Sequence, residues 1–537
     1  GLTAGFYGHC SVGCLHIRPF IDLRDPAQQQ AMTEVAEEVA GLVASLGGVN
    51  SSEHGDGLAR SQFNRQLFGA PLYEAMREVK RLFDPDGRMN PGKITDSPAM
   101  TENLRDPALP DAPQLVTLMD FGPGGMRGAA DRCMNVGVCR KSSAGVMCPS
   151  YMATRDEEHA TRGRANALVM ALSSPDPRRA LGGERLHEAL DLCLECKACK
   201  RECPLGVDMA SLKSEALAAR HELRGVPLRS RLFASIRSVN RVGSAVAPVA
   251  NAVLRLPGRR AAQRLIGIAP DRPLPRFAGE DLLTWFRRHR PPAEVPAGEV
   301  VVLADSFTTF SEPQIGVAAV ELLEMAGHRV TLAHEGCCGR PAISKGLLAV
   351  ARRQAAAMVA RLAEPARRGI PIVGVEPSCV LTLRDEYPAL LGDSAAVRAV
   401  ANAARLADSL LLEAVRDGRL SCHGPSPVGR IVLHTHCHQR AITGSADTVA
   451  LLEALPGAEV TELDSGCCGM AGSFGFEAEH YELSMQVGEL RLFPALRAEP
   501  AGSTVVATGV SCRQQIAHGT GRSAVHPLQL LRLHAGS

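Results

Sequence analysis

Four cysteines between residues 193 and 203 have the spacing of an iron–sulfur loop. The segment reads CLECKACKRECP, a C-x2-C-x2-C-x3-C-P pattern. This run is typical of bacterial ferredoxins, in which the fourth cysteine binds the other cluster when two are present. Structural zinc, the alternative, favours two separated cysteine pairs. The pattern predicts a 4Fe–4S cluster, which stores or passes one electron, with ligands drawn from Cys193, Cys196, Cys199 and Cys203.

A second cysteine loop, RCMNVGVCRKSSAGVMCPS, lacks one ligand. Cys133, Cys139 and Cys148 align with the first, third and fourth cysteines of the pattern, and Val136 takes the place of the second. If the loops exchange their fourth ligands, Cys148 completes a 4Fe–4S cluster with the first three cysteines of the other loop. Cys133, Cys139 and Cys203 then offer three thiolates, which suits a 3Fe–4S cluster or a 4Fe–4S cluster with one non-protein ligand. The alternative is one cluster held entirely by the first loop, with the second loop structural.

The sequence Cys-Cys-Gly occurs twice, within a repeat that is offset by 130 residues. HEGCCGRP at 334–341 matches DSGCCGMA at 464–471, and VVVLADSF at 300–307 matches RIVLHTHC at 430–437. The second copy offers four cysteines, which are Cys437, Cys467, Cys468 and Cys512. The first copy has Phe307 at the first of these places and keeps Cys337, Cys338 and Cys379. We expect a metal or cluster site in the second copy and a degenerate one in the first; buried structural cysteines are the alternative.

Histidines and a carboxylate near residue 1 form a third candidate site. YGHCSVGCLHIRP contains His9 and His16, and GGVNSSEHGDG contains Glu53 and His54. Two histidines and one carboxylate are a three-ligand set for a divalent metal that keeps one position open for substrate. The adjacent His54 would then serve as a general base. The alternative is that the two histidines, seven residues apart, are unrelated.

The elements that position these residues follow from the periodicity of the chain. Residues 1–95 are expected to be α+β, with a strand in CLHIRPFIDL and a helix capped by Asp25 and ended by Gly47. The apolar stripe of that helix is Met32, Val35, Val39, Leu42, Val43 and Leu46. Residues 96–125 are predicted to be a linker, 126–223 a helical ferredoxin-type domain and 224–295 an Arg-rich helical connector. Residues 296–537 are predicted to be a duplicated α/β domain, with halves 296–425 and 428–537 and parallel strands that carry the cysteines at their ends.

Composition excludes several classes of protein. The chain has 59 basic and 57 acidic residues, and we find no helix-turn-helix pattern, so nucleic acid is not an expected partner and an iron–sulfur regulator is disfavoured. No segment approaches the ~18 apolar residues of a spanning helix. Seventeen clustered cysteines without a visible signal peptide indicate reduced thiolates in the cytoplasm. The connector has fourteen arginines between residues 224 and 290, which predicts either a solvated helical arm or a peripheral contact at the inner face of a membrane.

Together the motifs resemble a known family. His9-x6-His16, EHGDG (53–57) and FDPDGRMNPGKI (83–94) resemble the C-terminal domain of FAD-linked oxidases of the D-lactate and D-2-hydroxyglutarate dehydrogenase group. The order of modules resembles bacterial fused D-2-hydroxyglutarate dehydrogenases that carry iron–sulfur domains. The last two modules are also similar to the iron–sulfur subunits of glycolate oxidase and anaerobic glycerol-3-phosphate dehydrogenase. The resemblance implies a multidomain α+β and α/β protein, whose first domain has a ferredoxin-like α+β fold.

The resemblance also implies roles for individual residues. His9, His16 and Glu53 would bind zinc or another divalent ion that holds the 2-hydroxyl and carboxylate of a small 2-hydroxy acid, and His54 would take the hydroxyl proton. Glu53, His54, Gly55 and Asn90 would lie at the flavin of FAD. Related enzymes often have an asparagine where this chain has Arg18, and Arg18 would pair with a distal substrate carboxylate, which favours hydroxyglutarate over lactate.

The glycine-rich FAD-binding domain that precedes this region in the family does not occur in the sequence. We expect it in a missing N-terminal part or in a separate subunit, and expect this chain alone to be inactive as a dehydrogenase. Electrons would pass from a D-2-hydroxy acid to FAD, then singly through the clusters to a quinone or another electron carrier. The alternative is an electron-transfer subunit without substrate chemistry of its own, and bound zinc would argue against it.

Overall fold

The computed structural model describes residues 2–23, 25–51, 53–104, 115–256, 258–291, 296–424 and 427–536. The chain divides into two compact units, Gly1–Asp111 and Ala112–Ser537, which are described separately. Within the predicted linker, residues 96–104 belong to the first unit, where the backbone N–H of Met100 donates to Gln62. Residues from 115 onward belong to the second, where the N–H groups of Leu118 and Met119 donate to Glu215.

The first unit is α+β, as predicted. Strands β1 (Ala4–His9) and β2 (Cys14–Pro19) form an antiparallel hairpin. Helix α1 (Pro26–Ser45) begins after Asp25, whose carboxylate accepts from the N–H of Ala27, so the predicted N-cap is confirmed. The remaining helices are α2 (Gly57–Arg60), α3 (Asn64–Phe68) and α4 (Ala70–Phe83).

The apolar stripe predicted on α1 is largely exposed to solvent. Val39 and Leu42 are 51% and 60% exposed, and Leu15 and Ile17 of the hairpin are 62% and 54% exposed. Burying such side chains stabilises a domain by roughly 1.5–3 kcal/mol each. The first unit therefore presents apolar surface that suits a covering domain.

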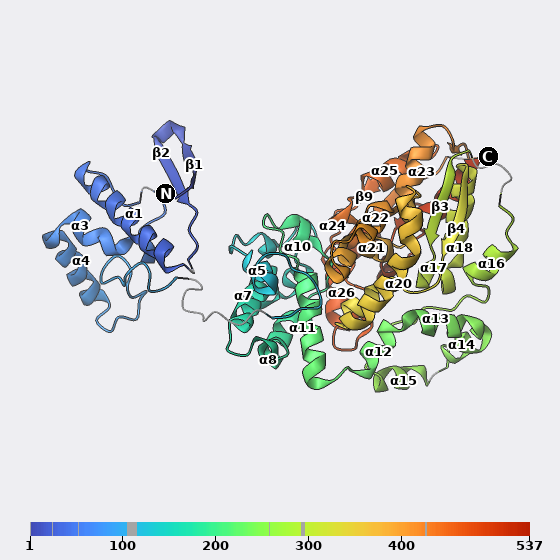
Figure 1. Ribbon diagram of the computed structural model, residues 1–537, viewed down its shortest axis with the longest axis horizontal. Coiled ribbons are helices and arrows are strands. Elements are labelled where there is room, and N and C mark those ends of the chain that lie inside the picture. Colours follow the sequence, from blue (N-terminus) through green and yellow to red (C-terminus); the bar gives the residue numbers. More distant parts are fainter. Residues whose placement is uncertain are drawn as a thin grey trace. The chain divides into compact units, whose positions relative to one another are not determined.

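The ferredoxin-type part of the second unit is helical (Figure 1). Its helices are α5 (Gly125–Asp131), α6 (Pro149–Thr154), α7 (Thr161–Leu172), α8 (Pro177–Leu181), α9 (Glu184–Asp191), α10 (Ala198–Glu202) and α11 (Met209–Arg224). The two cysteine loops have parallel layouts. Cys133 closely follows α5 and Cys148 precedes Pro149 of α6, whereas Cys193 closely follows α9 and Cys199 lies in α10.

The Arg-rich connector is helical, as predicted. It contains α12 (Leu228–Ala234), α13 (Ile236–Ala245), α14 (Ala247–Val253), α15 (Arg259–Leu265) and α16 (Leu282–Arg288). Some of its arginines bind the Cys-Cys-Gly halves: Arg272 is 1% exposed and donates to Gly475, Ser484 and Gln515. The connector is thus partly a packed element of the second unit. None of the described helices has the length and apolarity that crossing a bilayer requires.

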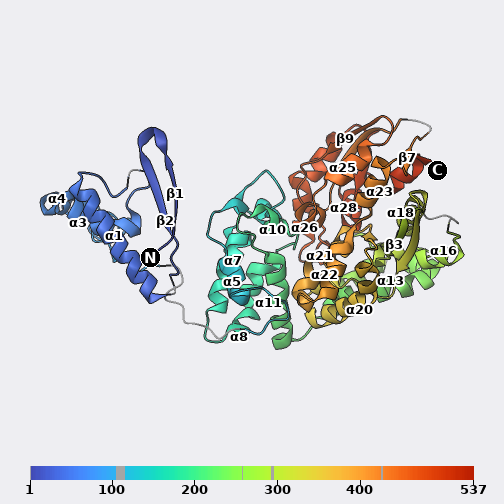
Figure 2. The same ribbon diagram turned by 45° about the horizontal axis from the view of Figure 1, so that its top comes forward.

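Residues 298–536 form two α/β halves that lie side by side (Figures 1 and 2). The first half contains β3 (Gly298–Leu303), α17 (Ser306–Phe310), α18 (Pro313–Met325), β4 (His328–Ala333), α19 (Arg340–Ser344), α20 (Leu348–Arg367), β5 (Ile372–Gly374), α21 (Pro377–Leu391), α22 (Ala395–Ala403) and β6 (Ala404–Leu406). Its parallel sheet has the order β4-β3-β5-β6. Alternate residues of β3 face opposite ways: Val300 and Val302 pack in the cluster of α18, Val301 and Leu303 in that of α20.

The second half repeats this order of elements. It contains β8 (Gly429–His434), α24 (Cys437–Ile442), α25 (Ala446–Glu453), β9 (Ala458–Glu462), α26 (Tyr481–Leu490), α27 (Leu492–Ala498), β10 (Thr504–Ala507) and α28 (Val510–Thr520). Its parallel sheet has the order β10-β8-β9. Between or after the halves lie α23 (Ala407–Arg416), β7 (Ser421–Cys422), α29 (Pro527–His534) and β11 (Ala535–Gly536). One buried apolar cluster includes Val302 and Leu433, so the halves share a core.

Candidate redox centres and metal site

The predicted histidine–carboxylate site is assembled in the first unit. Nε2 of His9 lies 3.5 Å and Nε2 of His16 3.8 Å from the carboxylate of Glu53, and Nε2 of His54 lies 3.5 Å from it. His9, His16 and Glu53 each offer a ligand atom, and these atoms lie within 4.8 Å of one another. Two imidazoles and a carboxylate converging at one end of the hairpin fit a divalent metal ion.

Two further side chains beside this site were not predicted. Sγ of Cys14 lies 3.8 Å from Nε2 of His16, and a hydrogen bond from Cys14, together with the charges of the nearby histidines, lowers the pKa of Glu53. The ring of Tyr7 stacks on His16 with centroids 4.7 Å apart, and its hydroxyl accepts from Nε of Arg18 at 3.0 Å. Arg18 is therefore held next to the predicted site. The hairpin register explains both contacts, because Tyr7 pairs with His16 and His9 with Cys14.

The predicted flavin-contacting residues are on two loops joined by one side chain. Asn64 donates from Nδ2 to Asp56 and to the carbonyl of Ile94, both at 3.1 Å. It thereby ties the EHGDG loop, with Gly55 at φ 71°, to the end of the MNPGKI segment. Asn90 lies in that segment with φ 50° and accepts from Lys93. Sequence reasoning did not identify Asn64, which is fully buried.

In the second unit, Cys148 of one loop lies close to three cysteines of the other. Burial and the charge of Cys148 both act to raise the pKa of Cys193, Cys196 and Cys199. This arrangement supports the exchange of fourth ligands. The pKa of Cys139 is raised likewise by burial and by Cys148 and Cys133, so the second set of thiols adjoins the first. Val136, where a cysteine is missing, is 63% exposed.

Two buried cations surround these cysteines. Arg164 is fully buried and donates to Ala189 at 3.0 Å, to Ser150 at 2.9 Å and to Sγ of Cys148 at 3.6 Å. Nζ of Lys213 donates to the carbonyls of Asp191 and Cys193, both at 2.8 Å. A buried cation is costly without a neighbouring negative charge. An anionic cluster with thiolate ligands would supply that charge, so the surroundings fit the predicted 4Fe–4S group.

Arg164→Gln is expected to lower the midpoint potential of that cluster. The variant keeps amide donors but removes a positive charge that favours the reduced, more negative cluster. The expected shift is on the order of 50–100 mV to more negative values, measured by EPR-monitored redox titration. Arg185→Gln on α9, which removes an exposed arginine, is the control and should leave the potential unchanged. Equal shifts in both variants would contradict this placement of the cluster.

The second Cys-Cys-Gly half brings its four predicted cysteines together with a histidine. A hydrogen bond from Cys467 lowers the pKa of Cys437 to about 7. Hydrogen bonds from Cys467 and Cys512 lower the pKa of Cys468 well below its ordinary value. A ring nitrogen of His434, Cys468 Sγ and Cys512 Sγ lie within 4.8 Å of one another. Hydrogen bonds with the neighbouring cysteines and burial raise the pKa of Cys467 and Cys512 well above the ordinary value. The site adds a histidine that the motif did not indicate.

His434 has the surroundings that are typical of a metal-binding histidine. Its Nδ1 lies 2.6 Å from the hydroxyl of Ser465, and its ring also interacts with the thiol of Cys468. Metal-binding histidines commonly bond through the second ring nitrogen to an orienting group. The strand β8 ends at His434, and this position could have been found by comparing it with the ends of other parallel strands.

The first half brings its three predicted cysteines together. A hydrogen bond with Cys338 and burial raise the pKa of Cys337 well above its ordinary value. The hydrogen bond with Cys337 lowers the pKa of Cys338, but a hydrogen bond with Cys379 and burial raise it well above the ordinary value. A hydrogen bond from Cys338 lowers the pKa of Cys379. Burial and the charge of Asp305 outweigh this effect and raise that pKa to about 11. The first half lacks a fourth cysteine, because Phe307 takes the place that Cys437 has in the second half. This difference supports the predicted degenerate site.

The iron–sulfur loop packs directly against the second half. Nε2 of His438 donates to the carbonyl of Glu195 at 2.9 Å, and the charge of Cys437 contributes to the raised pKa of Cys196. Glu195 and Lys197 have positive φ values of 51° and 61°, which are uncommon for residues other than glycine. The iron–sulfur loop and the cysteine site of the second half are therefore neighbours, and His438 links them.

Three family models match the chain in this order. Residues 1–94 match the C-terminal domain of FAD-linked oxidases, 129–207 a 4Fe-4S dicluster domain, and 304–384 and 431–517 a cysteine-rich domain. These matches agree with the predicted order of modules and with the FAD and iron–sulfur cofactors.

Curated relatives match different extents of the chain. The chain is 30% identical to D-2-hydroxyglutarate dehydrogenase of Escherichia coli over 99% of its own length and 56% of the relative. It is 31% identical to one subunit of the anaerobic glycerol-3-phosphate dehydrogenase of E. coli, over 66% of this chain and 92% of that subunit. It is 36% identical to D-lactate dehydrogenase of Archaeoglobus fulgidus over 18% of this chain and 20% of the relative. The chain thus spans about half the length of the D-2-hydroxyglutarate dehydrogenases that it matches. Through its 4Fe–4S dicluster and cysteine-rich modules the chain belongs to the family of that glycerol-3-phosphate dehydrogenase subunit, and along its whole length it is similar to the D-2-hydroxyglutarate dehydrogenases.

Proposed function

We propose that the chain is the substrate-binding and electron-transfer part of an FAD-linked D-2-hydroxy-acid dehydrogenase. The convergence of His9, His16, Glu53 and His54 in the first unit carries this proposal. D-2-Hydroxyglutarate is the favoured substrate and D-lactate the next, because Arg18 lies close to the metal-site residues and suits a second carboxylate. The exposed apolar faces of α1 and the hairpin support a covering FAD-binding domain, in the same or another chain.

The residues have distinct roles in this proposal. His9, His16 and Glu53 would hold the metal that orients the 2-hydroxyl and carboxylate, and His54 would take the hydroxyl proton at its imidazole. When bound, the flavin accepts a hydride and the clusters accept single electrons. Gly55 and Asn90 are proposed to lie at the flavin. The proposed domain boundaries are those predicted from the sequence.

In the second unit, the proposed ligands of the complete cluster are Cys148, Cys193, Cys196 and Cys199. Cys133, Cys139 and Cys203 would hold a second, three-thiolate cluster. Cys437, Cys467, Cys468 and Cys512, with His434, would hold a metal or cluster beside the first. Electrons would leave to a quinone or another carrier, with peripheral contact to a membrane.

Substrate identity is tested by anaerobic bleaching. The chain together with its FAD-binding domain is mixed in turn with D-2-hydroxyglutarate, D-lactate and glycolate, and flavin and cluster absorbance are followed. Bleaching by D-2-hydroxyglutarate alone is the expected result. If no acid bleaches intact clusters, the second candidate is favoured: an electron-transfer protein like the matched subunit of anaerobic glycerol-3-phosphate dehydrogenase, 92% of which the chain covers.

His54→Asn is expected to lower kcat by roughly 10²–10⁴-fold, because a general base at the substrate hydroxyl is lost. The KM and bound zinc should change little, since His9, His16 and Glu53 remain. Steady-state kinetics and metal analysis of the same preparation measure both. His9→Asn is the matched variant and should lose the metal as well as activity. Full activity in His54→Asn would contradict the assignment of the base.

A further inference from the structure

A cavity of about 620 Å³ lies among the ferredoxin-type part, the connector and both Cys-Cys-Gly halves. Its wall includes Cys193 of the iron–sulfur loop, Cys379 of the first half and Cys437 of the second. This volume is typical of sites for small organic ligands. A ligand here would border every candidate redox centre of the second unit except the thiols of the 133–148 loop.

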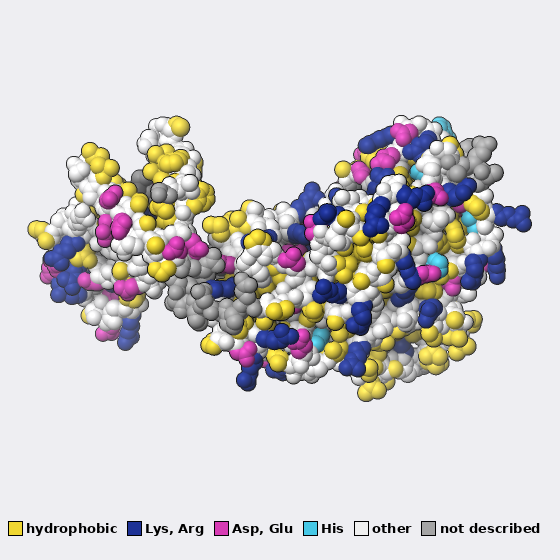
Figure 3. Space-filling model, in the orientation of Figure 1, with side chains coloured by type: hydrophobic (Ala, Val, Ile, Leu, Met, Phe, Trp, Pro, Cys, Tyr) yellow, Lys and Arg dark blue, Asp and Glu magenta, His cyan; other side chains and the backbone are white. Residues whose placement is uncertain are grey.

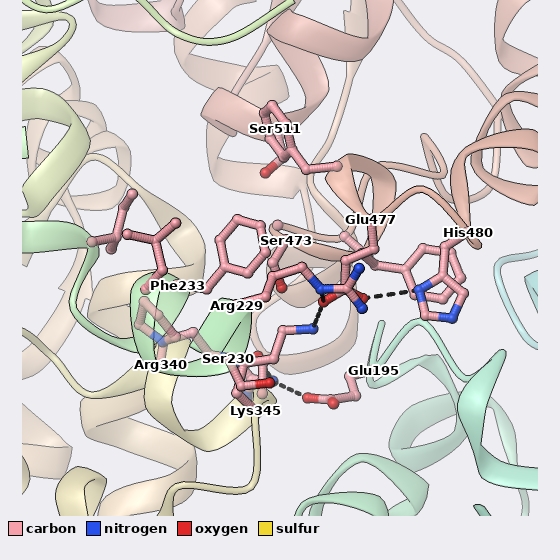
Figure 4. Close-up of a pocket in the computed structure, with 18 of the residues that line it drawn as sticks. Glu195, Arg229, Ser230, Phe233, Arg340, Lys345, Ser473, Glu477, His480 and Ser511 are labelled. Atoms are coloured by element: carbon pink, nitrogen blue, oxygen red, sulfur yellow. Dashed lines mark hydrogen bonds and ion pairs between the residues drawn. The ribbon is translucent and has the colours of Figure 1, made fainter. Parts of the chain in front are cut away.

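The charged groups of the cavity wall that Figure 4 labels are paired with one another or with nearby carboxylates. Arg340 binds Glu195 at 2.5 Å, and Lys345 and His480 bind Glu477. Arg229 binds Glu479 and lies 3.6 Å from Glu477. Paired cations do not offer the free positive charge that a phosphate-bearing carrier such as a nucleotide requires. The wall therefore suits an uncharged ligand.

Much of the rest of the wall is apolar, and serine, asparagine, glutamine and histidine side chains add polar groups to it. Phe233, Val239, Leu274 and Phe277 of the connector line the cavity. The hydroxyls of Ser473 and Ser511, from the second half, add neutral groups to the wall (Figure 4). An apolar chamber with a few neutral hydrogen-bonding groups matches a planar ring that bears carbonyl oxygens.

The connector also has an exposed apolar stripe with helical spacing. Val242, Val246, Val249, Val253 and Leu256 are between 50% and 66% exposed. Hydrophobic side chains gather over α14 and α15 at the lower right of Figure 3. A second hollow, lined by Arg255, Arg259, Arg260 and Arg276, shares Leu254 and Leu274 with the cavity. An apolar stripe beside arginines is typical of a helix that lies in an anionic lipid interface.

We propose that this cavity binds the ring of a lipid-soluble quinone, which enters from a membrane surface against α13 and α14. The inference rests on the proposed function, since oxidation of the hydroxy acid to a keto acid supplies two electrons and two protons. The quinone takes two electrons, one at a time, and two protons, so that both carbonyl oxygens become hydroxyls. His480, which joins Glu477 and Asp191, places proton-exchanging groups in the wall.

Binding is tested first, without the hydroxy acid. The cluster-loaded chain is titrated anaerobically with the fluorescent quinone analogue 2-heptyl-4-hydroxyquinoline N-oxide, and saturable quenching is expected. Val239→Trp, which fills the cavity, should weaken binding roughly tenfold or more. Val242→Trp, on the exposed side of the same helix, is the matched control and should bind as the native chain does. No quenching by the native chain, or equal binding by both variants, overturns the proposal.

Electron transfer is tested with clusters reduced by dithionite. A short-chain quinone should reoxidise them quickly in the native chain and roughly tenfold more slowly in Val239→Trp. Ferricyanide, which needs no cavity, should reoxidise both alike. Because dithionite replaces the hydroxy acid, failure of this step is distinguishable from failure of the proposed dehydrogenase. If the quinone reoxidises both proteins at equal rates, the cavity is not the quinone site and the proposal is overturned.

The source of the quinone is tested with anionic liposomes that contain a long-chain quinone. Val249→Asp with Val253→Asp places charges in the apolar stripe, away from the cavity wall. This variant should react normally with the short-chain quinone but roughly tenfold more slowly with the liposomal one. Unchanged reaction with liposomes would overturn entry along the stripe.

Discussion

Cys148→Ser is expected to remove the complete 4Fe–4S cluster, although Cys148 lies 45 residues before Cys193 in the sequence. The variant removes the proposed fourth ligand of the cluster held by Cys193, Cys196 and Cys199. Iron content should fall by about four atoms per chain, or by about one if a 3Fe–4S cluster forms instead. The rate of electron transfer through this cluster should fall by orders of magnitude. Iron analysis and EPR of the reduced protein measure the loss.

Cys203→Ser is the matched variant, since it removes the fourth cysteine of the continuous motif. It should keep the 4Fe–4S signal and lose only the signal of the three-thiolate cluster. The opposite pattern, with the 4Fe–4S signal lost in Cys203→Ser and kept in Cys148→Ser, would establish a single-loop cluster. Arg164 also favours the first outcome, because it donates to Cys148 and is buried where the cluster charge is needed.

The sequence was informative where chemistry depends on local spacing. The cysteine runs, the duplicated Cys-Cys-Gly halves and the N-cap at Asp25 each depend on residues within one turn or one repeat, and the fold and family predicted from them are confirmed. His434, Cys14 and Asn64 were missed because their roles depend on which strand or loop lies beside them. Such neighbours are set by tertiary packing.

The apolar stripe on α1 shows a second limit. Helical periodicity correctly predicted that Val39 and Leu42 share a face, but period alone does not say what covers that face. In the described residues the stripe is exposed, and the hairpin presents Leu15 and Ile17 in the same way. An apolar stripe that packs against another domain has the same sequence pattern as a stripe that packs within its own domain.

Between the iron–sulfur loop and the first Cys-Cys-Gly half lies a buried network of charges that no motif indicated. Arg340 is 7% exposed and binds both Glu195 and Glu386. Nζ of Lys197 lies 2.7 Å from Glu386 and also binds Asp385. Burial lowers the pKa of Lys197. The charges of Glu386 and Asp385 outweigh this effect and raise that pKa above its ordinary value. Because Glu195 and Lys197 alternate with cluster cysteines, the network fixes the loop that must hold the cluster.

Arg340→Met is therefore expected to destabilise the docking of this loop by about 3–5 kcal/mol, because it leaves Glu195 and Glu386 buried with one cation fewer. Amide hydrogen exchange of residues 193–203 and of α21 should quicken together, and the 4Fe–4S cluster should be lost sooner in denaturant. Arg430→Met, which breaks the exposed pair with Glu499, is the matched control and should leave the exchange of this loop unchanged. If Arg340→Met changes exchange no more than this control, apolar packing alone holds the loop, and the ion network has no structural role in placing the cluster beside His438.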